Sequence, residues 1–539
     1  MSKKISATLY PILIALVLLS GIYIGIELGS SSSGSEISLR QGSRQNKINQ
    51  VIAYIERQYV DSVRKDEMME EAIQSMLQHL DPHSYYISQD ELARMTEPLE
   101  GNFDGIGIEF MIQKDTVVVV NPIVGGPSEM LGILAGDRIV EVDGESIAGI
   151  GIKNSDVMEL LRGESGTKVD VGIKRRKRKN LLNFTITRGK IPIYSIDASL
   201  MVEPEVGYIK VSRFGKNTYE EFREASEKLK AEGMNKMILD LRNNGGGFMH
   251  AAIMMVDEFF RKGSLIVYTD GRNHTRKDYH TSSSGILHDT EVVVLVNENS
   301  ASASEIVSGA IQDNDRGTII GRRTYGKGLV QEHIPLPEGD AIRLTTARYY
   351  TPVGRSIQKP YGKGIDYEAD IYHRYESGSV YEQAEIDIPD SLVFETPKGK
   401  KVYGGGGIYP DIFVSIDTVG ASFYLSELNY SGTFNQFAFD YADNNRQEIK
   451  NYGSIEAFKK EFKITEDILQ QFVAHGEENG VGFDERGLEQ SKEQIKRRLK
   501  GMIARNVFRN GAYYAIILDE DNYIKEALKV FDGTTQLDL

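Results

Sequence analysis

Residues 299–305, which read Asn-Ser-Ala-Ser-Ala-Ser-Glu, contain a candidate nucleophile. They stand where an apolar strand, predicted over residues 292–296, leads into a helix. Side chains at such junctions lie at the rim of an α/β sheet, where these folds bind ligands. The spacing from Ser302 to Glu305 is also that of a capping box. A second interpretation therefore stays open, in which Ser302 only caps the helix.

Residues 325–331 contain a candidate general base, Lys327, flanked by Gly326 and Gly328. A lysine accepts a proton near neutral pH only when burial lowers its pKa, and the apolar and glycine neighbours suit such a site. Residues 321–327 also match the G-x-x-x-x-G-K start of a phosphate-binding loop. That loop continues with a Ser or Thr for Mg²⁺, whereas Gly328 follows here, so a nucleotide site is not favoured.

Residues 240–247 read Asp-Leu-Arg-Asn-Asn-Gly-Gly-Gly and follow another predicted strand. Glycines allow backbone amides to point at a developing oxyanion, and the helix after Ser302 would add its N-terminal dipole. Other hydrolase patterns are missing: the sequence has no G-x-S-x-G, no H-E-x-x-H and no cysteine. Thiol nucleophiles and cysteine-based metal sites are therefore excluded. His333 is the histidine near Lys327 and remains an alternative base.

Together, these three segments resemble the signature blocks of the carboxy-terminal processing peptidases. In that family the catalytic serine precedes the catalytic lysine by 25 residues, which is the separation of Ser302 and Lys327 and favours Ser302 over Ser300 and Ser304. The resemblance also implies that Gln331, four residues after the lysine, orients the base.

The same resemblance implies that the oxyanion is bound by the backbone amides of Gly246 and Ala303. The family's glycine block commonly reads Asn-Pro-Gly-Gly, whereas residues 244–247 of this chain read Asn-Gly-Gly-Gly. This difference leaves open which glycine donates.

Residues 96–190 show short strand patterns and are predicted to form a β-rich module with one or two helices. Within it, Gly105-Ile106-Gly107-Ile108 resembles the carboxylate-binding loop of a PDZ domain, and residues 127–129 and 134–139 match the rest of that pattern. In such domains the strand after the loop accepts a peptide by β-augmentation. The alternative is a structural module without a ligand. The basic run at residues 174–179 is interpreted as a solvated hairpin turn.

We expect a multidomain α/β protein. Strands and helices alternate between residues 195 and 420, which predicts a mostly parallel sheet; the resemblance gives this protease core a crotonase- or ClpP-like fold and places core strands at residues 347–352 and 406–411. Residues 81–84 are predicted to be a turn, and residues 365–400 an irregular insertion. The predicted domains are 1–28 (membrane anchor or signal), 29–45 (flexible linker), 46–95 (helical), 96–190 (PDZ), 191–420 (serine peptidase core) and 421–539 (helical).

The N-terminal segment predicts export. Residues 5–26 carry no charge and follow Lys3 and Lys4. About 20 apolar residues span a bilayer as a helix, and flanking lysines stay in the cytoplasm. An uncleaved anchor is favoured over a cleaved signal because residues 27–30 are a poor cleavage site. We expect a single-pass protein of the inner (cytoplasmic) membrane with its catalytic domain in the periplasm or another extracytoplasmic space.

These observations predict a serine endopeptidase with a Ser302/Lys327 dyad and no metal or cofactor. The resemblance implies envelope-protein substrates with accessible C-terminal tails, which the PDZ module selects. An adaptor or activator protein and a second copy of the chain are possible partners. The net charge of −15 argues against nucleic-acid binding. The alternative is a noncatalytic PDZ scaffold, which predicts loss of a dyad residue.

Overall fold

The computed structural model describes residues 15, 17–21, 47–176, 178–383 and 388–534. The chain divides into two compact units, Met1–Ser75 and Met76–Leu539. The first contains α2 (Lys47–Gln58) and the start of α3 (Lys65–Gln78). Most of the predicted membrane segment, residues 5–26, and all of the predicted linker, residues 29–45, lie outside the described residues. In the part that is described, no helix is long and apolar enough to cross a membrane, so the anchor stays a prediction.

A mostly parallel sheet forms the centre of the second unit, as the alternating pattern predicts. The strand order is β10-β11-β12-β15-β16-β21, and only the β10–β11 pair is antiparallel among these described strands. The strands are β10 (Ile196–Glu203), β11 (Val206–Val211), β12 (Lys236–Asp240), β15 (Glu291–Val296), β16 (Thr318–Gly321) and β21 (Ile412–Phe413).

Helices bury both faces of this sheet. One face packs against α7 (Thr218–Ala231), α8 (Met249–Asp257) and α9 (Ala303–Asp313). The other packs against α17 (Asn510–Ile517), η3 (Leu518–Glu520) and α18 (Asn522–Phe531). Two buried faces explain the nearly continuous apolar run of β15. The helix layer on the second face therefore comes from the C-terminal region, beyond the predicted boundary at residue 420.

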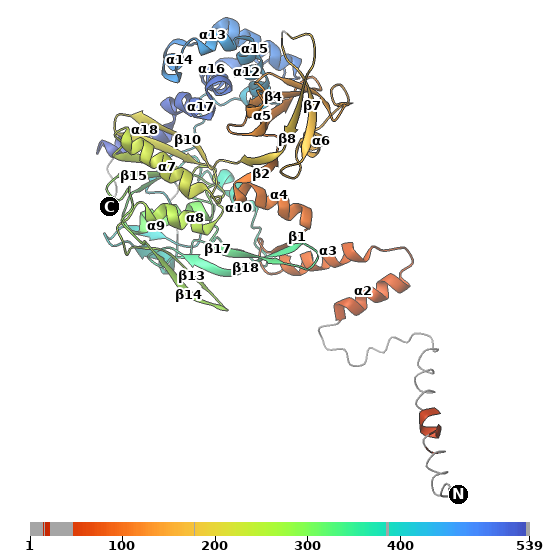
Figure 1. Ribbon diagram of the computed structural model, residues 1–539. Helices are drawn as coiled ribbons and strands as arrows, with labels where there is room; N and C mark the ends of the chain where they lie inside the picture. Colours follow the sequence, from red (N-terminus) through yellow and green to blue (C-terminus); the bar gives the residue numbers. More distant parts are fainter. Residues whose placement is uncertain (1–14, 16, 22–46, 177, 384–387, 535–539) are drawn as a thin grey trace, which may run out of the picture. The chain divides into compact units, whose positions relative to one another are not determined.

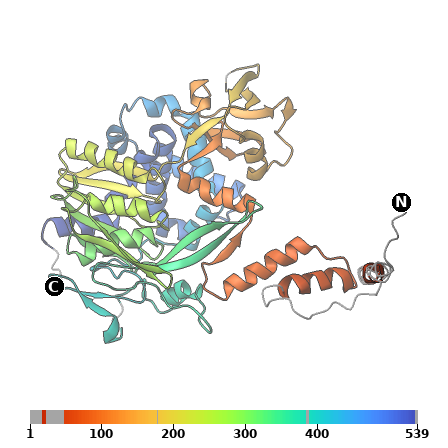
Figure 2. The ribbon, with the colours of Figure 1, turned by 60° about the horizontal axis from the view of Figure 1, so that its bottom comes forward.

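A second, antiparallel sheet lies beside the active-site segments. Its order is β1-β18-β13-β14, and β17 also pairs with β18. The strands are β1 (Tyr85–Ile87), β13 (Leu265–Gly271), β14 (His274–His280), β17 (Leu329–Pro335) and β18 (Ala341–Tyr350). Figure 2 shows β17 and β18 as a long curved ribbon along one side of the core.

Two expectations for the later part of the core are wrong. Residues 365–400 are not wholly irregular, since they contain α10 (Ala369–Glu376), η2 (Asp390–Leu392) and β19 (Val393–Glu395), which pairs with β20 (Lys401–Tyr403). Residues 406–411 are not a strand, and β21 begins only at Ile412. Instead of pairing with a strand, the backbone of Ile408 makes two hydrogen bonds to Thr324. The Thr324 N–H donates to the Ile408 carbonyl, and the Ile408 N–H donates to Thr324 Oγ1.

The β-rich module has the predicted composition of short strands and two helices. Its sheet order is β3-β4-β5-β7-β8, with β6 paired to β5. The elements are β3 (Ile108–Ile112), β4 (Val117–Pro122), α5 (Pro127–Met130), β5 (Arg138–Val142), β6 (Glu145–Ser146), α6 (Asn154–Leu161), β7 (Lys168–Lys174) and β8 (Leu182–Thr187). The basic run begins at Lys174, the last residue of β7, and its Arg175 pairs with the buried Asp137 at 2.7 Å.

Further helices and one ribbon complete the second unit. The helix α4 (Gln89–Glu100) and the ribbon of β2 (Asn102–Gly105) with β9 (Gly189–Pro192) join the β-rich module to the core. The C-terminal helices pack around their own apolar core and lie beside both the module and the protease core (Figures 1 and 2). They are α11 (Phe423–Tyr430), α12 (Thr433–Asn444), α13 (Arg446–Lys450), α14 (Ile455–Glu461), α15 (Glu466–Glu478) and α16 (Glu485–Phe508).

Candidate active site

Ser302 lies between the end of β15 and the start of α9, at the predicted strand–helix junction. Its φ of 54° and ψ of −110° fall in the left-handed half of the map, where a residue other than glycine costs about 1–3 kcal/mol. The Ser302 N–H donates to the Glu305 carboxylate at 2.8 Å, which is half of a capping box. Capping and nucleophilic roles are therefore compatible, because this capping bond engages the Ser302 backbone N–H and not its hydroxyl.

The neighbouring serines are engaged elsewhere. Ser300 and Ser304 are fully buried, and their hydroxyls donate to the carbonyls of Leu241 and Asn244, each at 2.8 Å. Ser302 is partly exposed. Of the three serines, Ser302 is therefore the one that a substrate can reach.

Glu305 connects the serine segment to the lysine segment. One of its oxygens, Oε2, accepts the N–H of Ser302 at 2.8 Å and that of Lys327 at 2.9 Å. The other, Oε1, accepts the Gly326 N–H at 2.7 Å and the Thr324 hydroxyl at 2.5 Å. Burial raises the pKa of Glu305, while these donors oppose that rise. The sequence pattern indicated only a capping role for this residue.

The Lys327 ammonium is disfavoured by its surroundings. Burial first, and the positive charge of Arg343 second, lower the pKa of Lys327 to about 8, while the negative charges of Glu305 and Asp81 oppose the shift. In the structure no hydrogen bond joins Ser302 Oγ to Lys327 Nζ, both of which are described; such bonds are often long in free enzymes and shorten when substrate binds. The lysine therefore has the electrostatic setting of a general base.

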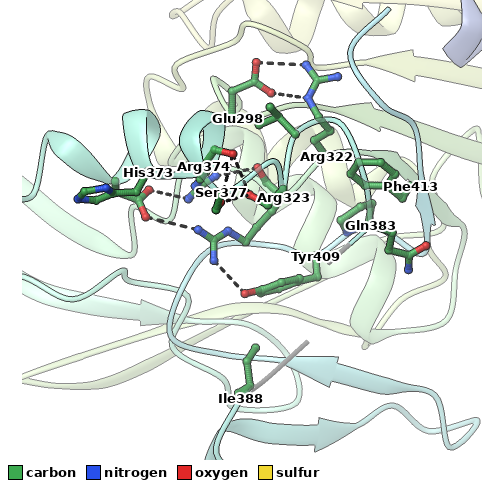
Figure 3. Close-up of a pocket in the computed structure, with 14 residues that line it drawn as sticks. Glu298, Arg322, Arg323, His373, Arg374, Ser377, Gln383, Ile388, Tyr409 and Phe413 are labelled. Carbon is green, nitrogen blue, oxygen red and sulfur yellow. Dashed lines mark hydrogen bonds and ion pairs between the residues drawn. The ribbon is translucent and has the colours of Figure 1, made fainter. Parts of the chain in front are cut away.

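The phosphate-loop interpretation does not fit this geometry. A phosphate would need the amides of Gly326 and Lys327, and Glu305 already accepts both. The preceding arginines are also engaged: Figure 3 shows Arg322 paired with Glu298 and Arg323 with Tyr409. These four residues line a pocket of about 390 Å³, which Ser302 and Lys327 do not line.

The amide of Gln331 donates to the carbonyl of His83 at 3.1 Å. It thus contacts the turn at residues 81–84, whereas its predicted contact with the base stays a prediction. Burial, and then the charge of Lys327, lower the pKa of His83 to about 4, which places this histidine next to the site. Sequence reasoning treated residues 81–84 only as a turn. The available signal was a pair of ionisable residues, Asp81 and His83, directly after a helix.

The glycine block lies against the nucleophile. A Cβ atom on Gly246 would lie 2.8 Å from the Ser302 Cβ and 3.0 Å from the Ala303 nitrogen, and Gly246 has a φ of 100°, so only glycine fits here. The Gly246 N–H donates to Asn244 Oδ1 at 2.9 Å. To bind an oxyanion, the Gly246 N–H would have to give up its bond to Asn244. The predicted role of Gly246 in binding the oxyanion stays a prediction. Ala303 is the first residue of α9.

The structure brings the predicted PDZ loop together at the start of an edge strand. Gly105 ends β2, Ile108 begins β3, and the Ile106 carbonyl accepts the Ser128 N–H at 3.0 Å and its hydroxyl at 2.6 Å. Among the strands described, β3 pairs only with β4. Its other edge can therefore accept an added strand.

Comparison with known proteins decides the family. A carboxy-terminal-processing protease of Bartonella bacilliformis is 34% identical over 388 residues, which cover 70% of this chain and 87% of that protein. The chain belongs to the carboxy-terminal processing protease family. It is therefore a serine-type peptidase with a PDZ domain, as the sequence predicts. CtpB of Bacillus subtilis, another carboxy-terminal processing protease, is 31% identical over 64% of this chain and 73% of its own length.

Family models match four parts of this carboxy-terminal processing protease. Residues 205–371 match peptidase family S41, residues 105–186 a PDZ domain, and residues 20–91 the N-terminal domain of the activating protease CtpB. Residues 424–510 match a family of unknown function. The solved structure of the photosystem II D1 C-terminal processing protease is 30% identical and covers 59% of this chain and 91% of its own, with a TM-score of 0.34.

Glu305→Gln tests whether Glu305 positions the serine and lysine segments for catalysis. The amide keeps the size of the side chain but offers one acceptor oxygen instead of two. We therefore expect kcat to fall by about 10- to 100-fold, which corresponds to the loss of one or two hydrogen bonds to a charged acceptor. Because the charge of Glu305 raises the pKa of Lys327, the alkaline rise of kcat/KM should move to lower pH. A pH–rate profile measures both. An unchanged profile with normal kcat would contradict this role.

Proposed function

We propose that this carboxy-terminal processing protease uses Ser302 as nucleophile and Lys327 as general base. One observation carries the proposal: a single oxygen of the buried Glu305 accepts the backbone N–H groups of both residues. The hydroxyl of Tyr349 lies between their carbonyls, at 3.2 Å from that of Ser302 and hydrogen-bonded to that of Lys327. Residues distant in sequence are thus held at one place by two buried side chains.

The proposed reaction follows from these positions. Neutral Lys327 removes the proton of the Ser302 hydroxyl, whose oxygen attacks the scissile carbonyl carbon. Backbone amides, with Gly246 and Ala303 as candidates, stabilise the tetrahedral oxyanion. The protonated Lys327 gives its proton to the leaving amine as the C–N bond breaks, and an acyl ester remains on Ser302. Lys327 then removes a proton from water, which attacks the ester; as the bond from the acyl carbon to Ser302 Oγ breaks, Lys327 returns the proton to Oγ and the acid is released.

We further propose that the PDZ domain selects substrates by their C-terminal tails. Residues 105–108 would hold the terminal carboxylate with backbone amides, and the free edge of β3 would pair with the tail. Gln331, whose side-chain amide donates to the carbonyl of His83, would hold the turn at residues 81–84 in place near Lys327.

Tail selection predicts a dependence on the free carboxylate. A reporter peptide that ends in an amide should be cleaved with a KM about 10-fold or more above that of the same peptide with a free C-terminus, because it lacks the charge-assisted bonds. The kcat values should agree, since the bond that is cut is the same. Steady-state kinetics on the two reporters give both numbers. Equal KM values would remove the PDZ domain from substrate selection.

The alternative function is a scaffold that binds tails without cutting them. Such a protein would bind the free-carboxylate reporter but leave it intact. The presence of both Ser302 and Lys327 supports the enzyme, because the scaffold predicts loss of a dyad residue. Mass spectrometry of the incubated reporter separates the two functions.

The location of the enzyme is part of the same proposal. We propose an inner-membrane anchor at residues 5–26, envelope-protein substrates and an activating partner protein. The support is the uncharged run after Lys3 and Lys4, together with the match of residues 20–91 to the CtpB N-terminal domain. Retention of the full chain in washed membranes, and its release by detergent, checks the anchor.

A further inference from the structure

The three active-site segments, which contain the glycine block, Ser302 and Lys327, all begin at the same edge of the parallel sheet. The glycine block follows β12, Ser302 follows β15, and Lys327 follows β16. These strands are neighbours and run parallel, with Leu239 opposite Val294 and Val294 opposite Ile319. Their carboxyl ends therefore lie side by side, and the spacing of the catalytic groups depends on what holds this edge together.

The aromatic ring of Tyr523, from the start of α18, lies at this edge. Its ring centroid is 4.4 Å from the guanidinium carbon of Arg242 and 5.8 Å from that of Arg322. Arg322 also donates a hydrogen bond to the Tyr523 hydroxyl. Gly321, the last residue of β16, has a φ of 135°, and a Cβ there would lie 2.9 Å from the Tyr523 ring. Such a Cβ would also lie 2.0 Å from the Val296 carbonyl oxygen, so the strand end is packed tightly against both β15 and this ring.

Each arginine is in turn fixed to the end of a catalytic strand. Arg242 binds Asp240, the last residue of β12, through Nε at 3.0 Å and Nη2 at 2.6 Å. Arg322 binds Glu298 through Nε at 2.7 Å and Nη2 at 3.1 Å, as Figure 3 shows. Glu298 stands four residues before the nucleophile. Through two arginines, one ring therefore contacts the ends of all three strands.

The start of α18 is itself secured at this position. Asp521 caps the helix, with Oδ1 accepting the N–H groups of Tyr523 at 2.8 Å and Ile524 at 3.4 Å. Its other oxygen accepts Arg242 Nη1 at 2.8 Å. Further along the helix, Ile524 and Ala527 are buried against the sheet. The ring of Tyr523, which is 8% exposed, therefore has little freedom to move.

We propose that Tyr523 is a positioning residue for catalysis: it holds the roots of the glycine, Ser302 and Lys327 segments at their catalytic spacing. The inference rests on the proposed roles of Ser302 and Lys327. It gives the C-terminal region a part in the active site, although Tyr523 touches no reacting atom. Misplacement of catalytic groups by about 1 Å can cost on the order of 100-fold in rate, so the packing of this ring matters to kcat.

The test compares three variants of the full chain. Tyr523→Phe removes only the hydrogen bond to Arg322 and should lower kcat about 10-fold; Tyr523→Leu also removes both ring–guanidinium contacts and should lower it about 100-fold. KM for the free-carboxylate reporter should change less than about twofold, because the PDZ domain is untouched. Tyr514→Phe is the matched control, since it also removes a tyrosine hydroxyl from the C-terminal region, but one that bonds to Asp197 on β10 and to neither arginine; kcat should stay within about twofold.

A second readout separates positioning from folding and from the dyad itself. An activated serine-directed phosphonate should label Ser302 in the parent, and its labelling rate should fall in parallel with kcat in the order Phe, then Leu, at a temperature where all variants are folded. If Tyr523→Leu does not fold, Asp521→Asn replaces it and should lower the labelling rate in the same direction. Labelling rates equal to that of Tyr514→Phe would overturn the inference. A parent that is not labelled at Ser302 would instead overturn the proposed nucleophile.

Discussion

Ser302→Ala should lower kcat/KM for peptide cleavage by about 10⁴- to 10⁶-fold, the cost of removing the nucleophile from a serine-type active site. The residual rate would come from substrate binding and the oxyanion amides alone. Binding of the free-carboxylate reporter should persist, because the PDZ domain lies in another part of the chain. Cleavage is measured by mass spectrometry and binding by titration with a labelled tail.

The adjacent serines supply matched controls for this experiment. Ser300→Ala and Ser304→Ala each remove a buried hydroxyl that donates to a backbone carbonyl. Each should lower the free energy of unfolding by about 1–3 kcal/mol because an acceptor is left without its donor. Neither should abolish phosphonate labelling. If Ser302→Ala cleaves like the parent, the proposed mechanism is wrong.

Lys327→Met should lower kcat/KM by about 10²- to 10⁴-fold, the range expected for loss of a general base. Methionine keeps an unbranched, apolar side chain of similar length, so the segment should stay folded. In the parent, kcat/KM should rise with pH through an apparent pKa near 8. The sign follows from burial: it disfavours the ammonium form, so the neutral, active lysine appears at a lower pH than in water. The variant should lose that rise.

His333 provides the contrasting substitution. Its side chain is exposed. Its partial burial, and then the positive charge of Arg343, lower its pKa and so favour the neutral imidazole. His333→Asn should keep both the rate and the alkaline rise. A Lys327→Met variant with normal activity, together with an inactive His333→Asn, would transfer the role of base to the histidine.

The family, the PDZ-containing architecture and the parallel core were all readable from local sequence. Strands such as β15 are continuous apolar runs, and α9 begins at a residue pattern typical of a helix start, so their positions depend on neighbouring residues only. The separation of Ser302 and Lys327 could likewise be read along the chain. Residues 406–411 were misread as a strand because their apolar and glycine content does not reveal that they hydrogen-bond to Thr324.

Only the tertiary structure decided how these segments are held. The bonds from Glu305 to Thr324, Gly326 and Lys327, the contact of Gln331 with His83, and the packing of Tyr523 at the strand ends all join residues far apart in sequence. No periodicity or spacing encodes such pairs, because they depend on which loops a sheet brings to one edge. The sequence by itself determined which residues can do the chemistry, and the fold decided which buried partners place and tune them.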